Sequence, residues 1–390
     1  MSKTIKTVAA TLLIVFSLEV LIFTFAIRPK LLEQDALSSK IDEIQSLIDK
    51  NAVLDFDSKQ AEKNAILGYM SGLDDHYINY WVPDDYQNYL DEQDGNFTGV
   101  GMTVQSQNGA IIEGLLVLRV IGNSPAENAG IKSMDRIIEV DGENIVGKEY
   151  QDVVNKILGE ENTDVSIKVL RDGTELEAAM TRKKFIQREV DYRIINNDIG
   201  YIQIHDFNTN AFDEFNSALN ELISKGVKGF IFDVRNNPGG EFQTIRNILD
   251  LLVPEDELVI LQYKERDQVY KSTGNRKTDL PMTVLVNNSS ASASELFASA
   301  LRDLNQSPLI GQKTFGKGIG QTTFTLYDGS GVKFTTFHYL TKSRTNYNEI
   351  GLVPDYDVEM SEENLTRFYA LEESEDNQLQ KAIEVISGMY

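Results

Sequence analysis

Few side chains in this chain of 390 residues are suited to nucleophilic or metal chemistry. There is no cysteine, and the three histidines (His76, His205 and His338) are scattered without an H-E-x-x-H motif. The lack of cysteine excludes disulfides and thiolate chemistry, and a histidine-based metal site is not expected. A serine can act as the nucleophile if it has a base beside it. A lysine can be that base where burial lowers its pKa into the working range.

Two segments offer the backbone geometry that a catalytic serine needs. NSSASASE, residues 288–295, follows a predicted strand and leads directly into a predicted helix. A serine at that junction has backbone N–H groups and a helix N-terminus beside it, which suits an exposed nucleophile and a stabilised oxyanion. RNNPGG, residues 235–240, ends another predicted strand, and its glycines let N–H groups approach a substrate carbonyl. Taken alone, each segment is more often an ordinary turn, so a Ser–Lys hydrolase is only one hypothesis here.

Lys317 lies between glycines in GQKTFGKGIGQ, residues 311–321. This stretch matches a phosphate-binding loop, except that Gly318 stands where a Ser or Thr is needed. A phosphate loop also needs a helix directly after the lysine, because the helix N-terminus helps to hold the anion. The residues that follow are β-branched, alternating and broken by glycine, and they predict a β-hairpin. We therefore reject nucleotide binding. A lysine flanked by glycines is usually solvated, and it needs burial to act as a base.

The elements that must position these segments alternate between strand and helix over residues 200–355. This succession predicts right-handed βαβ units and a largely parallel sheet. Ligand sites in such sheets lie at the carboxyl ends of the strands, where both turns fall. Upstream, residues 95–185 show short apolar runs and two Asp-Gly turns, which predict a compact β-rich module. Residues 31–50 carry apolar side chains at helical spacing and predict a stalk or association helix, and the pattern continues to about Met70.

The N-terminal segment, residues 7–27, is apolar and long enough to span a bilayer as a helix. Basic residues on both sides orient it weakly, and Glu19 within it carries a cost. A cleaved signal peptide is the alternative, but the apolar region is long for one and the small-residue site ending at Ala26 is poor. We expect an uncleaved single-pass anchor in the cell membrane, with the bulk of the chain in the extracellular or periplasmic space.

The length and charge of the chain restrict its organisation and its partners. A chain of this length is expected to form two or more domains. The formal net charge of −23 argues against nucleic acid or an anionic membrane surface as a partner, because phosphate binding depends on clustered Lys and Arg. The same charge is suited to keeping an exported protein soluble.

The stretch NSSASASELFASALRDLNQSPLIGQKTFGKGIGQ, residues 288–321, strongly resembles the signature of the carboxyl-terminal processing (tail-specific) serine peptidases. That family carries a SASASE run followed, at the spacing found here, by T-F-G-K-G-x-x-Q. By resemblance, Ser292 is the nucleophile, Lys317, 25 residues downstream, is the general base, and Gln321 orients the lysine. A base must be neutral, so Lys317 is expected to be desolvated, in the company of Phe315 and the glycines.

The resemblance also names oxyanion-hole and peptide-binding residues. DVRNNPGG matches the family's D-L-R-x-N-P-G-G, which makes Gly239, Gly240 and the N–H of Ala293 candidates for the oxyanion hole. FTGVGM resembles the loop of a PDZ module, which receives a peptide's C-terminal carboxylate through backbone N–H groups. The peptide-binding candidates in that loop are Gly99, Val100, Gly101 and Met102. One departure is Gly320, which stands before the glutamine where the family commonly has a branched apolar residue.

The fold that this resemblance implies is a crotonase-like (ClpP/crotonase) α/β catalytic core with an inserted β-rich PDZ domain. No metal and no organic cofactor are implied. The candidate elements for homo-oligomer formation are the stalk and the C-terminal helix, although each could equally pack on its own subunit. The expected parts are a cytoplasmic tip with a transmembrane anchor (1–30), a helical region (31–94), the PDZ domain (95–185), the serine peptidase core (186–360) and a C-terminal helical segment (361–390).

The function implied is a membrane-anchored endopeptidase that cleaves proteins near their C-termini after the PDZ domain has captured the tail. One alternative is a PDZ-type adaptor or pseudoprotease that binds tails without cleavage. The intact set of Ser292, Lys317 and Gln321 argues against it. A crotonase-type acyl-CoA enzyme is the other alternative. The PDZ-like insertion, the lysine and the negative charge argue against that one.

Overall fold

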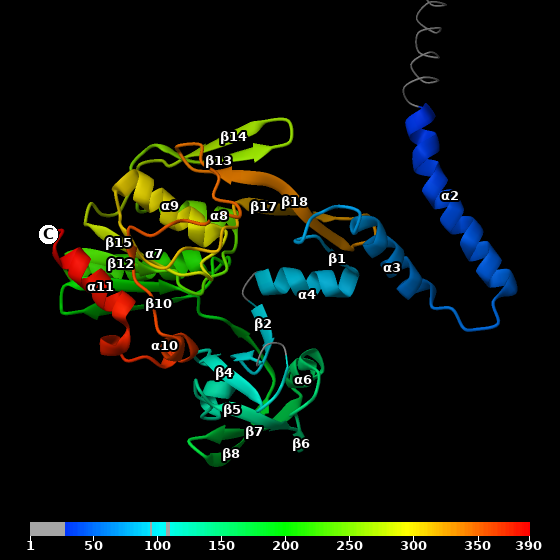
Figure 1. The fold of residues 1–390 in the computed structure, drawn as a ribbon, viewed down its shortest axis with the longest axis horizontal. Coiled ribbons are helices and arrows are strands. Elements are labelled where there is room, and N and C mark those ends of the chain that lie inside the picture. The colour runs from blue at the N-terminus through cyan, green and yellow to red at the C-terminus, as the bar shows by residue number, and fades with distance from the viewer. Residues whose placement is uncertain (1–27, 94–95, 107–109) are drawn as a thin grey trace, which may run out of the picture. The chain divides into compact units, whose positions relative to one another are not determined.

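The computed structural model describes residues 28–390 except 94–95 and 107–109 (Figure 1). The chain divides into two compact units, Met1–Gly72 and Leu73–Tyr390. In the first, the described residues form helices α2 (Arg28–Asn51) and α3 (Ser58–Met70), as their apolar spacing predicted. The predicted membrane segment, residues 7–27, lies outside the described residues. In the part of the chain that is described, no helix has both the length and the apolar composition to cross a bilayer.

A six-stranded sheet forms the centre of the second unit, in the order β10-β11-β12-β15-β16-β19. The strands from β11 to β19 pair in parallel, which confirms the predicted parallel sheet. The edge strand β10 is antiparallel to β11 and was not predicted. The strands are β10 (Val190–Ile195), β11 (Ile199–Ile204), β12 (Gly229–Asp233), β15 (Met282–Val286), β16 (Leu309–Gly311) and β19 (Tyr356–Asp357).

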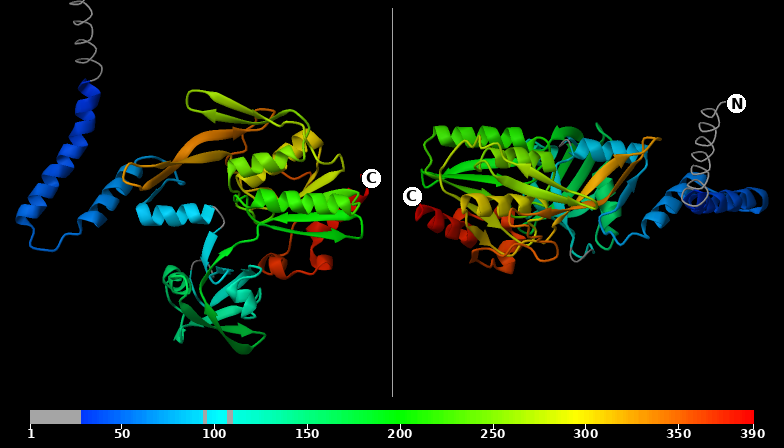
Figure 2. Two further views of the ribbon diagram at one scale, coloured as in Figure 1. Left: turned by 180° about the vertical axis from the view of Figure 1, so that it is seen from behind. Right: turned by 90° about the horizontal axis from the view of Figure 1, so that it is seen from above.

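Helices cover both faces of this sheet (Figure 2). Successive side chains of a strand point to opposite faces, so Phe230 and Phe232 of β12 pack in one core and Ile231 packs in another. β12 is buried along its whole length, which is why GFIF lacks polar alternation. The first core also contains side chains of α7 (Ala211–Ser224), α8 (Phe242–Asp250) and α9 (Ala293–Asn305), and the second contains those of α11 (Asn377–Ser387).

A second sheet joins segments that are far apart in the sequence. Its order is β1-β18-β13-β14, and β17 also pairs with β18. The β17–β18 hairpin confirms the prediction for the residues after Lys317. Asn79 lies beside Lys333 where β1 meets β18, so residues upstream of the β-rich module reach the same hairpin. The bounds are β1 (Asn79–Trp81), β13 (Glu257–Tyr263), β14 (Asp267–Lys271), β17 (Ile319–Thr325) and β18 (Gly331–Leu340), with helix α4 (Pro83–Gln93) after β1.

The predicted β-rich module is a sheet in the order β3-β4-β5-β7-β8, with β6 beside β5, and β2 pairs separately with β9. The β7–β8 hairpin turns at Asp172 and Gly173, which have φ of 49° and 78°. Two positive φ values are what a two-residue Asp-Gly hairpin turn requires. The elements are β2 (Asn96–Gly99), β3 (Met102–Gln105), β4 (Leu115–Val120), α5 (Pro125–Asn128), β5 (Arg136–Val140), β6 (Glu143–Asn144), α6 (Tyr150–Ile157), β7 (Asp164–Arg171), β8 (Thr174–Thr181) and β9 (Lys183–Ile186).

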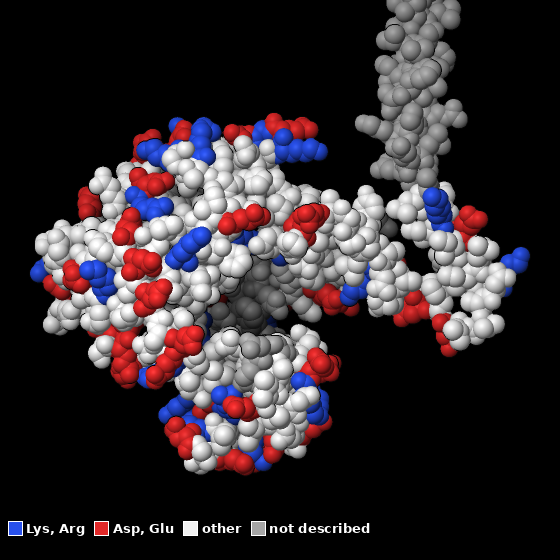
Figure 3. Space-filling view, in the orientation of Figure 1, with Lys and Arg blue, Asp and Glu red and all other residues white. Residues whose placement is uncertain are grey.

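Short helices lead from the central sheet into α11. They are α10 (Glu362–Thr366) and the 3₁₀ turns η2 (Phe368–Ala370) and η3 (Glu373–Glu375). On the face that Figure 3 shows, the described Lys and Arg side chains lie among Asp and Glu side chains. This mixed surface is unlike the clustered Lys and Arg of a nucleic-acid-binding face.

Candidate active site

The turn between β15 and α9 presents Ser292 at the N-terminus of the helix. Ser292 has φ 55° and ψ −114°, a conformation that costs a non-glycine residue about 1–3 kcal/mol. The RNNPGG turn holds this strained backbone, because the carbonyl of Asn237 accepts the N–H of Ala291 (3.1 Å) and the hydroxyl of Ser294 (2.9 Å). The strand, turn and helix predicted around NSSASASE are present, and Ser292 is 9% exposed.

The buried carboxylate of Glu295 joins the serine turn to the lysine loop. Its Oε2 accepts the backbone N–H of Ser292 (3.0 Å) and of Lys317 (2.8 Å). Its Oε1 accepts the N–H of Gly316 (2.8 Å) and the hydroxyl of Thr314 (2.6 Å). Burial raises the pKa of Glu295, and these hydrogen bonds offset part of the rise. We predicted no role for Glu295 from the sequence, although the last letter of SASASE was a signal for it.

Lys317 is half-buried, and its amine lies on an aromatic ring. Its Nζ is 4.2 Å from the centroid of the Tyr77 ring, and it has no hydrogen-bond acceptor among the described residues. Burial lowers the pKa of Lys317, as a general base requires. Phe315, which we expected beside the amine, has a side chain that is 57% exposed. The aromatic ring that contacts the Lys317 amine therefore lies outside the lysine loop. No local pattern in the sequence pointed to Tyr77.

Gln321 lies in β17, at the start of the hairpin that follows Lys317. Its Nε2 donates to the hydroxyl of Thr335 in β18 (3.0 Å). Among the described residues, no hydrogen bond joins Gln321 to Lys317. The neighbouring Gly320 packs against Phe337, and a Cβ there would lie 2.1 Å from that ring. The ring explains why this chain has glycine where a branched apolar residue was expected.

Ser292, Lys317 and Gln321 line one cleft of about 810 Å³. Five aromatic residues of its wall pack edge-on or tilted against one another. They come from α8 and from the strands of the second sheet, and they are Phe242, Tyr263, Tyr270, Phe337 and Tyr339, while Tyr89 of α4 also lines the cleft. An extended peptide with an apolar side chain near Ser292 suits such a wall, since buried aromatic surface strengthens apolar contacts.

The RNNPGG turn lies directly against Ser292. Gly239 has φ 120°, and a Cβ there would lie 2.9 Å from Ser292 Cβ. Its N–H donates to the side chain of Asn237 (2.8 Å), so it is already engaged. The N–H groups of Gly240 and Ala293 have no acceptor among the described residues. Of the three oxyanion-hole candidates, these two have N–H groups that can receive a substrate oxygen without losing a bond.

Asp206 lies behind the same turn. A Cβ on Gly240 would be 2.8 Å from Asp206 Oδ1 and 2.6 Å from the backbone carbon of Phe207, so the turn needs glycine. That buried Oδ1 has no hydrogen-bond partner among the described residues. Burial, together with the charge of Glu189, raises the pKa of Asp206 to about 8. No local pattern in the sequence pointed to this carboxyl group.

Comparison with known proteins identifies the family of this chain. The Peptidase family S41 profile matches residues 198–358, and the PDZ domain profile matches residues 98–181. The Carboxyl-terminal-processing protease of Synechocystis sp. is 32% identical over 338 residues, which are 85% of this chain and 78% of that protein. The Carboxy-terminal processing protease CtpB of Bacillus subtilis is 33% identical over 330 residues, 83% of this chain and 68% of that one. The chain belongs to the S41 family of carboxyl-terminal processing serine proteases.

Solved structures agree with this assignment of the chain to the S41 proteases. The photosystem II D1 C-terminal processing protease superposes with a TM-score of 0.55 at 29% identity, over 82% of this chain and 86% of that one. The S41 protease fold, with its PDZ domain, is therefore the fold of this chain. As a serine peptidase with a PDZ domain, the chain acts on protein or peptide substrates.

The predicted peptide-binding loop of this S41 protease, residues 99–102, joins β2 to β3. Gly99 ends β2 and Met102 begins β3. The carbonyls of Val100 and Gly101 accept hydrogen bonds from within the module (2.8 and 3.0 Å). Their N–H groups have no acceptor among the described residues, which is the arrangement a carboxylate-binding loop needs.

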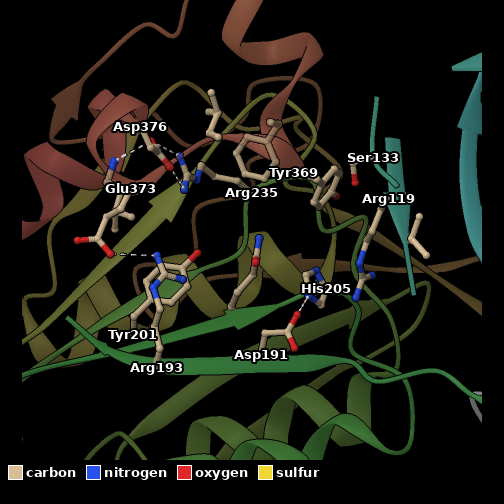
Figure 4. A pocket seen from close by; sticks show the side chains of 15 residues that line it. Arg119, Ser133, Asp191, Arg193, Tyr201, His205, Arg235, Tyr369, Glu373 and Asp376 are labelled. Carbon is tan, nitrogen blue, oxygen red and sulfur yellow. Dashed lines mark hydrogen bonds and ion pairs between the residues drawn. The ribbon is translucent and has the colours of Figure 1, made fainter. Parts of the chain in front are cut away.

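A second cavity of the S41 protease, about 290 Å³, lies between the PDZ module and the central sheet (Figure 4). Its lining contains no lysine, and three pairs form among its ionisable side chains, whereas the guanidinium of Arg119 donates to the backbone carbonyl of Arg188 (3.4 Å). The pairs are Arg235 with Asp376 (2.7 Å), His205 with Asp191 (2.8 Å) and Arg193 with Glu373 (3.5 Å). Arg235 opens the RNNPGG turn, so its pairing fixes the backbone that carries Gly239 and Gly240.

Proposed function

We propose that this chain is a membrane-anchored, extracytoplasmic serine endopeptidase that cleaves proteins near their C-termini by Ser–Lys catalysis. The observation that supports it most directly is the carboxylate of Glu295, which holds the backbone of Ser292 and of Lys317 at 3.0 and 2.8 Å. Two residues 25 apart in the sequence are thereby held in one cleft, with an aromatic wall for an apolar substrate.

In the proposed mechanism, neutral Lys317 takes the proton of the Ser292 hydroxyl as Oγ attacks the substrate carbonyl. The N–H groups of Gly240 and Ala293 stabilise the oxyanion, and Gly239 leaves room for the substrate beside Ser292. The protonated lysine then gives its proton to the leaving amine, and an acyl-enzyme remains on Ser292. Water, deprotonated by Lys317, hydrolyses that ester. Gln321 positions the loop of Lys317 from β17.

The PDZ module supplies the preference for C-terminal tails. The free N–H groups of the loop at residues 99–102 bind the terminal carboxylate, and the tail then extends toward the cleft. The relatives named as carboxyl-terminal processing proteases support this assignment. A PDZ adaptor without cleavage is the alternative, and the unoccupied N–H groups of Gly240 and Ala293 favour the peptidase.

The sequence is the basis for three further parts of the proposal: the membrane anchor, the class of the catalytic core and association with a second copy. Residues 7–27 form the uncleaved single-pass anchor and place the peptidase outside the cytoplasm, in the cell membrane. The catalytic core, residues 186–360, is of the crotonase-like class. Residues 31–50 associate with a second copy through apolar side chains, and those of Leu37, Ile44 and Leu47 are exposed.

The test is cleavage of an unstructured protein with an apolar C-terminus by the full chain in detergent. We expect wild type to cut it with chelator present, and Ser292→Ala and Lys317→Ala to bind it without cutting. Amidation of the substrate's C-terminus is expected to raise KM. Tail binding by wild type without any cleavage would support the adaptor, and cleavage by Ser292→Ala would refute the nucleophile.

A further inference from the structure

A segment ahead of the PDZ domain contacts the proposed catalytic lysine. β1 pairs with β18, and just before it the ring of Tyr77 receives the Lys317 amine at 4.2 Å from the ring centroid. Tyr77 is half-buried, and 240 residues separate it from Lys317 in the sequence. Lys317 Nζ has no hydrogen-bond acceptor among the described residues, so its contact in the described structure is the cation–π contact with this ring.

Asp75 holds the segment that carries Tyr77 and is linked to Gln321 through Thr335. Its Oδ1 accepts the N–H of Tyr77 (3.0 Å), and its Oδ2 accepts the N–H of Thr335 (2.7 Å). The hydroxyl of Thr335 donates to Asp75 Oδ1 (3.1 Å) and accepts from Gln321 Nε2 (3.0 Å). One chain of hydrogen bonds therefore runs from Asp75 through Thr335 to Gln321.

Charges from several elements act on Lys317. Burial lowers its pKa, Lys333 lowers it further, and two carboxylates raise it. The ring of Tyr77 also favours the charged form, because a ring face attracts an ammonium ion and has no such attraction for a neutral amine. The titratable groups that face Lys317 or these partners are Lys333, Asp75, Glu295, Tyr77, Glu349 and His76.

We propose that Tyr77 and Asp75 are positioning residues of the peptidase site. The ring holds protonated Lys317 in the resting enzyme, and Asp75 fixes both that ring and the Thr335–Gln321 contact. This inference rests on the proposed Ser–Lys mechanism. A protonated lysine on the ring cannot take the proton of Ser292. The amine must first lose its proton and leave the ring, so Tyr77 sets the pH at which the enzyme becomes active.

The test is the pH dependence of kcat/KM for the full chain in detergent, with Tyr77→Leu beside Tyr77→Phe. Tyr77→Leu removes the ring and keeps an apolar neighbour, so the acid limb is expected to move to lower pH. A cation–π contact of ordinary strength corresponds to a movement of about half a unit to one and a half units. Tyr77→Phe keeps the ring face and should leave the limb in place. Tyr77→Met, a second apolar replacement, should move the limb as Tyr77→Leu does.

Two outcomes would overturn the assignment of Tyr77: a limb that Tyr77→Leu and Tyr77→Met leave in place, or one that Tyr77→Phe moves as far as they do. Ser292→Ala in the same series separates this failure from failure of the mechanism. Cleavage lost in Ser292→Ala with an unmoved limb refutes only the role of Tyr77, and cleavage that survives refutes the mechanism itself.

The role of Asp75 is tested at Thr335, which joins it to Gln321. Thr335→Val is expected to lower kcat with little change in KM, and Thr335→Ser is expected to restore kcat. Equal kcat in Thr335→Val and wild type would overturn the positioning role of Asp75.

Discussion

Glu295 Oε2 accepts the backbone N–H of Ser292 at 3.0 Å and the backbone N–H of Lys317 at 2.8 Å. A single carboxylate oxygen thus sets the spacing between the turn of the proposed nucleophile and the loop of the proposed base. Both donors are backbone groups, so the link does not depend on the side chains of Ser292 or Lys317. It depends on the carboxylate at position 295, whose other oxygen already accepts the N–H of Gly316 and the hydroxyl of Thr314.

Glu295→Gln is expected to disrupt this link while keeping the size of the side chain. The amide has one acceptor oxygen and an NH₂ group, and that NH₂ must face N–H donors. Misplacement of catalytic groups by about 1 Å costs roughly 10²-fold, and we expect a loss of kcat/KM of that size. The free energy of unfolding should fall by about 1–3 kcal/mol, because buried donors lose their acceptor. Steady-state kinetics and urea unfolding measure both effects. The exposed Glu363→Gln is the control, and equal activity of the two variants would contradict the account.

Gly240→Ala is expected to damage both stability and catalysis. Gly240 has φ 138°, and a Cβ would lie 2.6 Å from the backbone carbon of Phe207. Gly142→Ala is a matched control, since it has φ 74° with nothing within 4 Å of its Cβ. The control should lower the free energy of unfolding by about 1 kcal/mol, because alanine strains the backbone at positive φ. In urea unfolding, Gly240→Ala should lower the free energy of unfolding by more than the control does. It should also lower kcat/KM by up to about 10²–10³-fold, because moving the turn displaces the N–H proposed to bind the oxyanion. Equal effects of the two substitutions would argue against a close-packed turn at Gly240.

Asp376→Asn is expected to weaken the buried ion pair behind the RNNPGG turn. Burial acts to raise the pKa of Asp376, but Arg235 and backbone N–H groups outweigh it, and the net pKa is lowered. A carboxyl with a lowered pKa stabilises the fold above its unfolded pKa and loses that contribution as pH falls. Asp376→Asn should therefore cost about 3–5 kcal/mol in the free energy of unfolding at pH 7 and less below about pH 4. The exposed pair of Lys228 and Asp198 is the comparison, and Asp198→Asn should cost less than about 1 kcal/mol. A cost for Asp376→Asn that stays constant down to pH 3 would contradict the pairing.

Asp206→Asn is expected to show the opposite dependence on pH. The pKa of Asp206 rises from 3.8 to about 8 on folding, so the folded state holds this proton more tightly than the unfolded state does. Wild type then loses stability as pH rises toward 8, whereas an asparagine does not ionise. Relative to wild type, the variant should gain about 1 kcal/mol in the free energy of unfolding per pH unit between pH 5 and 8. Urea unfolding across that range measures the gain. A difference that does not vary with pH would show that Asp206 ionises normally.

Much of the fold could be predicted because its signals are local. The parallel strands carry continuous apolar runs, and the β17–β18 hairpin alternates after the glycines of the lysine loop. In the site, the placement of Ser292 and Lys317 followed from two motifs at one spacing. What could not be predicted depends on contacts between distant segments. β1 has three residues, too few to show a period, and its pairing with β18 is set by tertiary packing.

The partners of the proposed catalytic groups show the same limit. Tyr77 and Asp75 lie in a polar stretch ahead of the PDZ module, and no local pattern relates them to Lys317 or Gln321. From the sequence we expected the group that desolvates Lys317 to be Phe315, in the same loop. Phe315 is largely exposed, and the ring on the amine belongs to Tyr77.

The most direct test of the central claim is the labelling of Ser292 by a fluorophosphonate probe, measured against pH in wild type and Lys317→Ala. We expect one adduct, mapped to Ser292. Its rate of formation should rise with pH as Lys317 loses its proton, at a pH below the ordinary pKa of lysine. In Lys317→Ala the labelling should be at least about 10²-fold slower, as expected for loss of a general base. Labelling of another residue would contradict the account. So would labelling of Lys317→Ala at the wild-type rate and with the wild-type dependence on pH.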